Sequence, residues 1–255
     1  MSRTQVIMTF IHAGGAGKTS TTRDIGAELA RRGKRVLLVD LDPQANLTEW
    51  LGVQNVQPQE TVQATLERGS PLPQPRQAHG MDLIPAHLDM IQTEAVLTAV
   101  YNAEGQLRQA LKSVVESGQY DYILLDAPPS LGKITANGGN AANWLIIPLP
   151  ATRKGLDALR GLNGAINMYS STNPNMRIGM YLMTQLTNTN TSKDVVAAYE
   201  QLLPADQLTG SITQRPAVFG DCQLREEPIG PSNREAYSEV VAATDFMLGR
   251  MEHQA

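Results

Sequence analysis

The sequence predicts an α/β fold with a doubly wound, mostly parallel β-sheet flanked by helices on both faces. Short apolar runs rich in β-branched residues alternate with amphipathic helical stretches along the chain. The apolar runs lack an alternation of period two, which is typical of strands that are covered on both faces. The chain has 255 residues, of which 42% are hydrophobic and 18% charged, so it has enough apolar side chains for one large core. We therefore expect a single domain spanning residues 1–255.

The strands are predicted from apolar segments that are too short for the helices of a globular domain. The segment from 69 to 80 is rich in proline and glycine. We interpret it as a surface loop, because the alternation of strands and helices resumes directly after it. In chain order, the predicted strands cover residues 5–11, 35–42, 82–87, 120–130 with its exit loop, 143–150, 177–184 and 208–213.

The helices are predicted from the amphipathic stretches between these strands. The first of them ends at Gly33, since glycine readily takes the left-handed conformation that closes a helix. In chain order, the predicted helices cover residues 19–33, 60–68, 104–118, 155–169, 192–203 and 234–251.

Composition restricts the classes of protein to consider. The formal net charge of −4 argues against a strongly basic, constitutive nucleic-acid binder. The single cysteine, Cys222, cannot form a disulfide within the chain, which favours a reducing cytoplasm. No segment approaches the ~20 apolar residues that span a bilayer, and the N-terminus shows no secretory signal. We expect a soluble cytoplasmic protein without membrane contact.

The glycine-rich stretch "FIHAGGAGKTS" at residues 10–20 indicates a phosphate-binding loop, or P-loop. It follows a predicted strand and opens a predicted helix at Lys18 and Thr19. Its glycines let backbone N–H groups converge on phosphate oxygens, and the helix N-terminus adds its positive dipole. We expect Lys18 to bridge the β- and γ-phosphates and Thr19 to supply a hydroxyl to Mg²⁺. The predicted phosphate-binding residues are Gly14, Gly15, Ala16, Gly17, Lys18, Thr19 and Ser20.

Acidic residues end the strands that follow this loop. Asp40 and Asp42 lie at the carboxyl end of the second predicted strand, in "VLLVDLDPQ", and Asp126 ends the apolar run "YILLDAPPS". The carboxyl ends of parallel strands are where ligands bind in such sheets. The run that ends in Asp126 has the form of a Walker B strand, whose carboxylate contacts Mg²⁺ through water.

The segments "GGAGKTS", "LLVDLDPQANLTEWLG" and "YDYILLDAPPSLG" together resemble the ParA/MinD family of deviant Walker-type P-loop ATPases, and the ParA branch most closely. The similarity continues through "WLIIPLPATRKGLDALRGL" and "REAYSEVVAATDFML", so it covers nearly the whole chain. The resemblance implies ATP and Mg²⁺ as cofactors and slow hydrolysis of ATP to ADP and phosphate. It also implies that Asp42 orients or activates the attacking water, while Asp40 and Asp126 serve the Mg²⁺ hydration shell.

The sequence departs from the family pattern within the loop. The family's first lysine, which reaches the partner's phosphates in an ATP-bound dimer, falls on Ala13. Another cation could replace it, the dimer could be weak, or the contact could be lost. By position, the best substitute is Lys154, with Arg153 as the second choice; Lys154 could equally be a solvated residue at a helix start. His12 occupies the place of the first glycine of the general P-loop pattern, and we expect it to face the loop from the strand end.

The segments around the nucleotide base are less specific. "MTQ" with Gln185, and "TQRP" with Gln214 and Pro216, align loosely with adenine-contacting segments of the family. Structural turns would have the same appearance.

The resemblance implies an ATP-dependent homodimer that binds DNA nonspecifically on the nucleoid and partitions plasmid or chromosomal DNA with a ParB-like adaptor. Such binding rests on basic side chains that neutralise phosphates. Either a basic stripe formed in the dimer or an ordinary mixed-charge surface would account for Lys193, Arg215, Arg225, Arg234 and Arg250.

Two other functions stay open. The first is a McdA-like ATPase that positions carboxysomes or another protein cargo with a McdB-like adaptor, as the change at Ala13 suggests. The second, more distant, is a P-loop synthetase acting on a small molecule, since the fold alone does not determine function. A MinD-like membrane cycler is disfavoured, because the C-terminal segment lacks a basic amphipathic helix.

Overall fold

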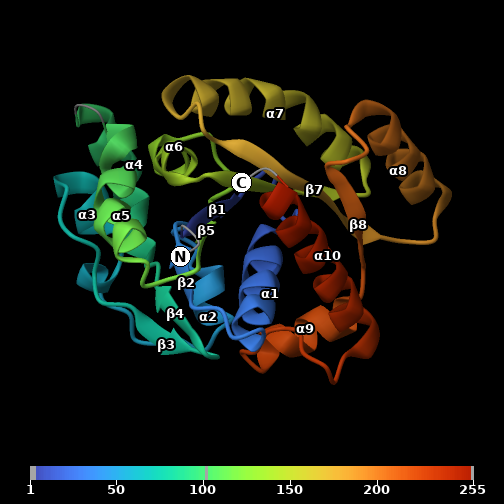
Figure 1. The fold of residues 1–255 in the computed structure, drawn as a ribbon, viewed down its shortest axis with the longest axis horizontal. Helices are drawn as coiled ribbons and strands as arrows, with labels where there is room; N and C mark the ends of the chain where they lie inside the picture. The colour runs from blue at the N-terminus through green and yellow to red at the C-terminus, as the bar shows by residue number, and fades with distance from the viewer. Residues whose placement is uncertain (1–3, 101–102, 254–255) are drawn as a thin grey trace.

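A computed structural model of the chain describes residues 4–100 and 103–253. The parts of the predicted domain at 1–3, 101–102 and 254–255 lie outside the described residues. The described chain forms one eight-stranded sheet in the order β3-β4-β2-β5-β1-β6-β7-β8 (Figure 1). The strands are β1 Gln5–Thr9, β2 Val36–Asp40, β3 Arg76–Ala78, β4 Met81–Ile84, β5 Tyr122–Asp126, β6 Trp144–Pro150, β7 Arg177–Leu186 and β8 Leu208–Thr213.

Every pair of neighbouring strands is parallel except β3 and β4, which pair antiparallel at one edge of the sheet. The α-helices are α1 Lys18–Arg31, α2 Asn46–Glu49, α3 Gln63–Arg68, α4 Ile91–Ala99, α5 Gln106–Ser117, α6 Lys133–Ala141, α7 Arg153–Thr172, α8 Asn190–Leu202, α9 Pro216–Leu224 and α10 Arg234–His253. Short 3₁₀ turns cover Pro58–Glu60, Leu88–Met90 and Ala103–Gly105.

Helices cover both faces of the sheet, as predicted (Figure 1). Successive residues of a strand point to opposite faces, so Ile7 packs in the core beneath α1 and α10, whereas Met8 packs in the core beneath α3 to α8. Both side chains are completely buried. The central residues of such a strand are apolar on both faces, which is why its sequence lacks period-two alternation.

The helices α1 and α10 lie side by side on one face of the sheet (Figure 1). The hydroxyl of Tyr237 donates to Oε2 of Glu28 at 2.7 Å, and Arg32 forms an ion pair with Asp245 at 2.5 Å. These contacts attach the last helix of the chain to the helix that follows the phosphate loop.

Several elements of the structure were not predicted from the sequence. The predicted loop at 69–80 contains the short strand β3, and α2, α4, α6 and α9 were not predicted. The segment "KITANGGNA" of α6 has low helix propensity because it contains two glycines and two asparagines. Packing explains it: a Cβ at Gly139 would lie 2.7 Å from the ring of Tyr169, so glycine allows α6 to approach α7 closely.

No helix in the described part of the chain has both the length and the apolar character needed to cross a bilayer.

Candidate functional site

The loop between β1 and α1 has the backbone conformation that glycine permits. Gly15 and Gly17 have φ values of 71° and 91°, which are left-handed values that glycine adopts without a steric cost. A Cβ at Gly14 or Gly15 would meet no atom of the described residues within 4 Å, so the space beside this backbone is open. Gly17 begins α1 without a side-chain cap in the described structure. The first N–H groups of the helix are therefore available to an anion.

Lys18 lies folded over this loop. Its side chain is buried, and its Nζ donates to the carbonyl oxygen of Ala13 at 3.0 Å. Burial lowers the pKa of Lys18, while the nearby carboxylates of Asp126 and Asp42 act in the opposite direction. The cation thus lies between the glycine loop and two acids, where a phosphate group would be stabilised.

Asp126 is the centre of the acidic part of the site. It is completely buried at the end of β5 and aligns in register with Thr9 of β1 and Asp40 of β2. Burial raises the pKa of Asp126 to about 7, although the nearby Thr19 hydroxyl and the Lys18 ammonium oppose the shift. Oδ1 accepts from the hydroxyl of Thr22 at 3.2 Å.

Two oxygens at this point of the sheet are buried without a hydrogen-bond partner among the described residues: Oδ2 of Asp126 and Oγ1 of Thr9. A buried polar group without a partner is costly, so such groups indicate a ligand or a bound water. Within 4–100 and 103–253, no three His, Cys, Asp or Glu side chains form a metal-binding cluster. Mg²⁺ in proteins usually keeps several waters and is bound through one or two carboxylates together with phosphate oxygens of the substrate.

Asp40 has partners within the protein at both carboxylate oxygens. Oδ1 accepts from the backbone N–H of Asp42 at 3.1 Å, and Oδ2 accepts from the N–H and the hydroxyl of Thr48 at 3.0 and 2.8 Å. Burial, followed by the nearby Asp126, raises the pKa of Asp40 well above its ordinary value. In the structure this carboxylate holds the chain around Asp42. That Asp40 also serves a magnesium hydration shell stays a prediction.

Asp42 lies just beyond the end of β2, on the same side of the sheet as the glycine loop. Its side chain is mostly buried, and its Oδ1 accepts from the backbone N–H of Gln44 at 3.0 Å. Its backbone is fixed by Asp40, as described above. The carboxylate is thus held by local hydrogen bonds close enough to Lys18 to affect its pKa.

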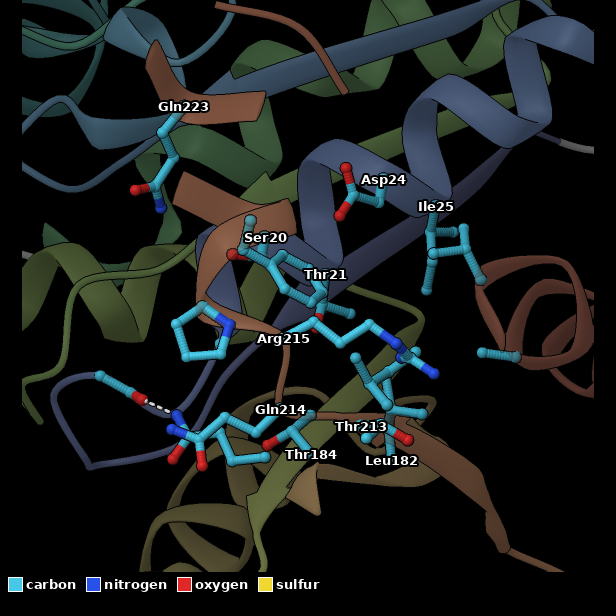
Figure 2. Close-up of a pocket in the computed structure, with 18 of the residues that line it drawn as sticks. Ser20, Thr21, Asp24, Ile25, Leu182, Thr184, Thr213, Gln214, Arg215 and Gln223 are labelled. Carbon is cyan, nitrogen blue, oxygen red and sulfur yellow. Dashed lines mark hydrogen bonds between the residues drawn. The ribbon is translucent and has the colours of Figure 1, made fainter. Parts of the chain in front are cut away.

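A cavity of about 370 Å³ opens beside the loop (Figure 2). It lies between the start of α1, the ends of β7 and β8, and α9 and α10. In Figure 2, Ser20 and Thr21 of α1 face Thr184 of β7 and the segment with Gln214 and Arg215. A cavity that connects a phosphate loop with a partly apolar chamber has the form of a mononucleotide site.

All three residues predicted to contact the base line this cavity, namely Gln185, Gln214 and Pro216. The amide of Gln185, however, points to the phosphate loop, where its Nε2 donates to the carbonyl oxygen of Gly15. Other residues that line the cavity, among them Trp50 and Phe219, were not predicted from the sequence. No local sequence motif marks either residue. Each reaches the cavity only because of how α2 and α9 pack in the fold.

Lys154 lies beside the loop, as its position in the sequence suggested. Its exposed Nζ donates to the carbonyl oxygen of Gly14 at 3.4 Å. Thr152 caps α7, because its hydroxyl accepts from the N–H of Gly155. Lys154 and Arg153 thus occupy the first turn of α7, where the helix dipole disfavours cations. A Cβ at Gly155 would lie 2.1 Å from the carbonyl oxygen of Pro150, so this glycine brings α7 close to β6.

The candidate DNA-contacting residues are largely paired with acids. Arg215 forms ion pairs with Glu239 at 2.6 Å and Glu235 at 3.5 Å, and it lines the cavity. Arg225 pairs with Asp221, and Arg250 pairs with Asp206. The remaining two candidates, Lys193 and Arg234, are exposed.

The two remaining residues with expected roles, His12 and Cys222, differ in their burial. His12 is exposed beyond the end of β1. Cys222 is buried, and burial raises the pKa of its thiol. A buried thiol of this kind has a packing role.

Comparison with known proteins places the chain in a family. A family model described as an AAA domain matches residues 4–178. The chain is 38% identical over 259 residues to the probable plasmid-partitioning protein ParA of Thermus thermophilus, an alignment that covers 96% of this chain and 78% of the relative.

Solved structures share the fold over the whole length. The structure described as cobyrinic acid a,c-diamide synthase from Mycobacterium smegmatis, with bound ADP and magnesium, is 29% identical, with a TM-score of 0.77 over 98% of this chain and 95% of that one. A variant of McdA from Cyanothece in complex with ATP is 22% identical, with a TM-score of 0.85 over 98% of each chain. The glycine loop, the acidic strand ends and these similarities lead to one conclusion: the chain belongs to the ParA/MinD family of P-loop ATPases, in its ParA branch.

Proposed function

We propose that this protein is a ParA-type ATPase that dimerises with ATP, binds DNA nonspecifically and partitions plasmid or chromosomal DNA. ATP and Mg²⁺ are its cofactors, and its place is on the nucleoid in the cytoplasm. One observation carries the proposal. At the carboxyl ends of the inner strands β1, β2 and β5, Lys18 lies between a glycine loop and the carboxylates of Asp42 and Asp126. A ParB-like adaptor would accelerate hydrolysis.

The residues present fit a magnesium ion with a nucleotide. Thr19 follows Lys18 at the start of α1 and supplies a hydroxyl, and Asp126 has one buried oxygen without a partner in the described structure. When bound, Mg²⁺ neutralises charge on the β- and γ-phosphates. We assign Thr19 to direct coordination and Asp126 to contact through water.

In hydrolysis, Lys18 would leave the Ala13 carbonyl and pair with the β- and γ-phosphates. Asp42 would accept a hydrogen bond from the attacking water and place it in line with the γ-phosphate. Asp40 acts on Asp42 through the backbone: it accepts the Asp42 N–H and the two donors of Thr48. The protein thus supplies positioning and charge, which are what phosphoryl transfer requires.

The proposal is tested by co-sedimentation with random-sequence DNA. We expect the protein to sediment with DNA in ATP and Mg²⁺, but not without nucleotide, and binding to fall as salt is raised because it rests on phosphate neutralisation. Asp42→Ala, which retains ATP, should remain on DNA for longer than the unaltered protein. Binding that is independent of ATP, or absent in all conditions, would contradict the proposal.

A second function is a McdA-like ATPase that positions carboxysomes or another protein cargo on the nucleoid with a McdB-like adaptor. The observation that favours it is the contact of Lys154 with the loop in a chain that has Ala13 in place of the family's lysine. Both functions include binding to DNA, so the co-sedimentation experiment does not separate them. A pull-down with this protein as bait does. An adaptor that itself binds DNA indicates DNA partition, and an adaptor that binds the protein cargo indicates positioning of that cargo.

A small-molecule synthetase is favoured by one observation, the 29% identity to a structure described as a cobyrinic acid a,c-diamide synthase. Such an enzyme would consume ATP only with its acid substrate and would not bind DNA. The co-sedimentation experiment therefore separates it from the partition proposal.

The buried Asp126 predicts a pH dependence. Its pKa of about 7 in the folded chain lies above the ordinary value of 3.8, so the folded state binds the proton more tightly than the unfolded state. The nucleotide-free protein should therefore lose stability as the pH rises from roughly 4 to roughly 7. We expect thermal unfolding measured across this range to show the decline, and Asp126→Asn to lessen it. Asp40 supplies the remainder, because burial raises its pKa as well. A decline that is equally steep in Asp126→Asn would contradict the assignment to Asp126.

A further inference from the structure

The carbonyl oxygens of the phosphate loop accept hydrogen bonds from side chains. Four consecutive carbonyl oxygens, from residue 13 to residue 16, each accept a hydrogen bond from a different side chain. The first donor is Lys18, from the helix that follows the loop. The other three come from the ends of distant elements. These bonds are Lys154 Nζ to Gly14 at 3.4 Å, Gln185 Nε2 to Gly15, and Thr184 Oγ1 to Ala16 at 3.0 Å.

Gln185 reaches the loop because the end of β7 is irregular. The pairing of β7 with β8 shifts register between Thr184 and Leu186, so Gln185 is the extra residue of a bulge. Its φ is 56°, a left-handed value that is rare outside glycine. Backbone hydrogen bonds fix the residues on either side. The N–H of Ala151 donates to the carbonyl oxygen of Thr184 at 2.8 Å, and the N–H of Gln214 donates to the carbonyl oxygen of Leu186 at 2.9 Å.

These side-chain bonds determine where the loop's N–H groups point. A peptide unit is planar and trans, so the carbonyl of one residue and the N–H of the next point in opposite directions. When Gln185 holds the Gly15 carbonyl, the N–H of Ala16 must point away from Gln185. Thr184 fixes the N–H of Gly17 in the same way, through the Ala16 carbonyl. Orienting N–H groups before the ligand arrives avoids part of the ordering cost of binding.

We propose that Gln185 is a positioning residue for the phosphate loop, acting through the Gly15 carbonyl, and that it recognises no part of the base. The assignment rests on the proposed binding of ATP. The amide nitrogen of Gln185 is already engaged by the loop in the described structure, and the left-handed bulge directs the side chain there. Loss of a residue that positions the loop lowers the affinity for nucleotides whose phosphates the loop binds. Loss of a base contact lowers the affinity for every adenine nucleotide equally.

The test is Gln185→Gly, with dissociation constants for ADP and AMP measured by calorimetry in Mg²⁺. Glycine suits a φ of 56° and removes only the side chain, so the fold is retained. Loss of one hydrogen bond should weaken ADP binding by about 2- to 10-fold. The dissociation constant of AMP, which lacks the β-phosphate, should be the same for this variant as for the unaltered chain. Thermal unfolding should occur at the same temperature as in the unaltered chain, or higher.

Two further variants distinguish the alternatives. Thr184→Val removes the hydroxyl bonded to Ala16 and should give the same split between ADP and AMP. Gln214→Ala, whose side chain lines the cavity but has no bond to the loop in the described structure, is the matched control and should not give that split. Equal weakening of ADP and AMP in Gln185→Gly would overturn the proposal, as would unchanged affinity for both. If the unaltered chain bound neither nucleotide, the proposed function would fail and this assignment with it.

Discussion

Asp42→Ala is expected to lower steady-state ATP hydrolysis by about 10²- to 10⁴-fold while leaving ATP binding almost unchanged. The carboxylate lies beyond the phosphate loop and is held by the N–H of Gln44 at 3.0 Å. We propose that this carboxylate orients the attacking water and contributes little to the affinity for the nucleotide. Because its own negative charge is removed, binding of the triphosphate should be slightly stronger.

The measurement is phosphate release at saturating ATP, combined with a binding titration of the same preparation. Asp194→Ala is the matched control, since Asp194 is an exposed aspartate on α8, away from the site. We expect the control to have unaltered turnover. Turnover of Asp42→Ala close to that of the unaltered chain would remove Asp42 from the mechanism.

Lys154→Ala is expected to weaken the ATP-dependent dimer by about 30-fold or more, since losing one partner of a buried charge pair costs about 2 kcal/mol or more. Ala13 is buried and has no charge to offer. Lys154 is exposed, lies 3.4 Å from the Gly14 carbonyl and occupies a helix position that disfavours cations. In the proposed dimer, the phosphates of the second subunit would lie close to this cation.

Light scattering with and without ATP measures this effect. Arg153→Ala is the control of equal charge from the neighbouring position, and we expect it to dimerise normally. An undiminished dimer in Lys154→Ala would exclude Lys154 from this role. If Arg153→Ala were the defective variant instead, Arg153 would be the substitute cation.

The fold class and the conformation of the glycine loop could be predicted because their signals are local. The apolar runs without alternation identified strands covered on both faces, and the structure confirms the parallel sheet. Gly15 and Gly17 occupy the left-handed positions that the motif requires. Asp126 could be predicted as a strand end, because the residue that ends an apolar run in a parallel sheet lies at the ligand-binding edge.

Contacts between distant segments could not be predicted. Thr48 holds both Asp40 and the N–H of Ala86, yet no spacing in the sequence distinguishes it from other threonines. Gln185 depends on a bulge that arises from the pairing of two late strands. Arg215 is a basic residue of the kind that contacts DNA, but Glu239 holds it in an ion pair beside the cavity. Each of these depends on the tertiary path of the chain.

The glycine at position 155 sets a limit on how this protein can diverge. Its missing Cβ would lie 2.1 Å from the Pro150 carbonyl, so any other residue would separate the start of α7 from the end of β6. Lys154 would then be displaced even though its own codon had not changed. The reach of the Lys154 side chain therefore depends on the residue that follows it, and a substitution at Gly155 would alter that reach without any change at position 154.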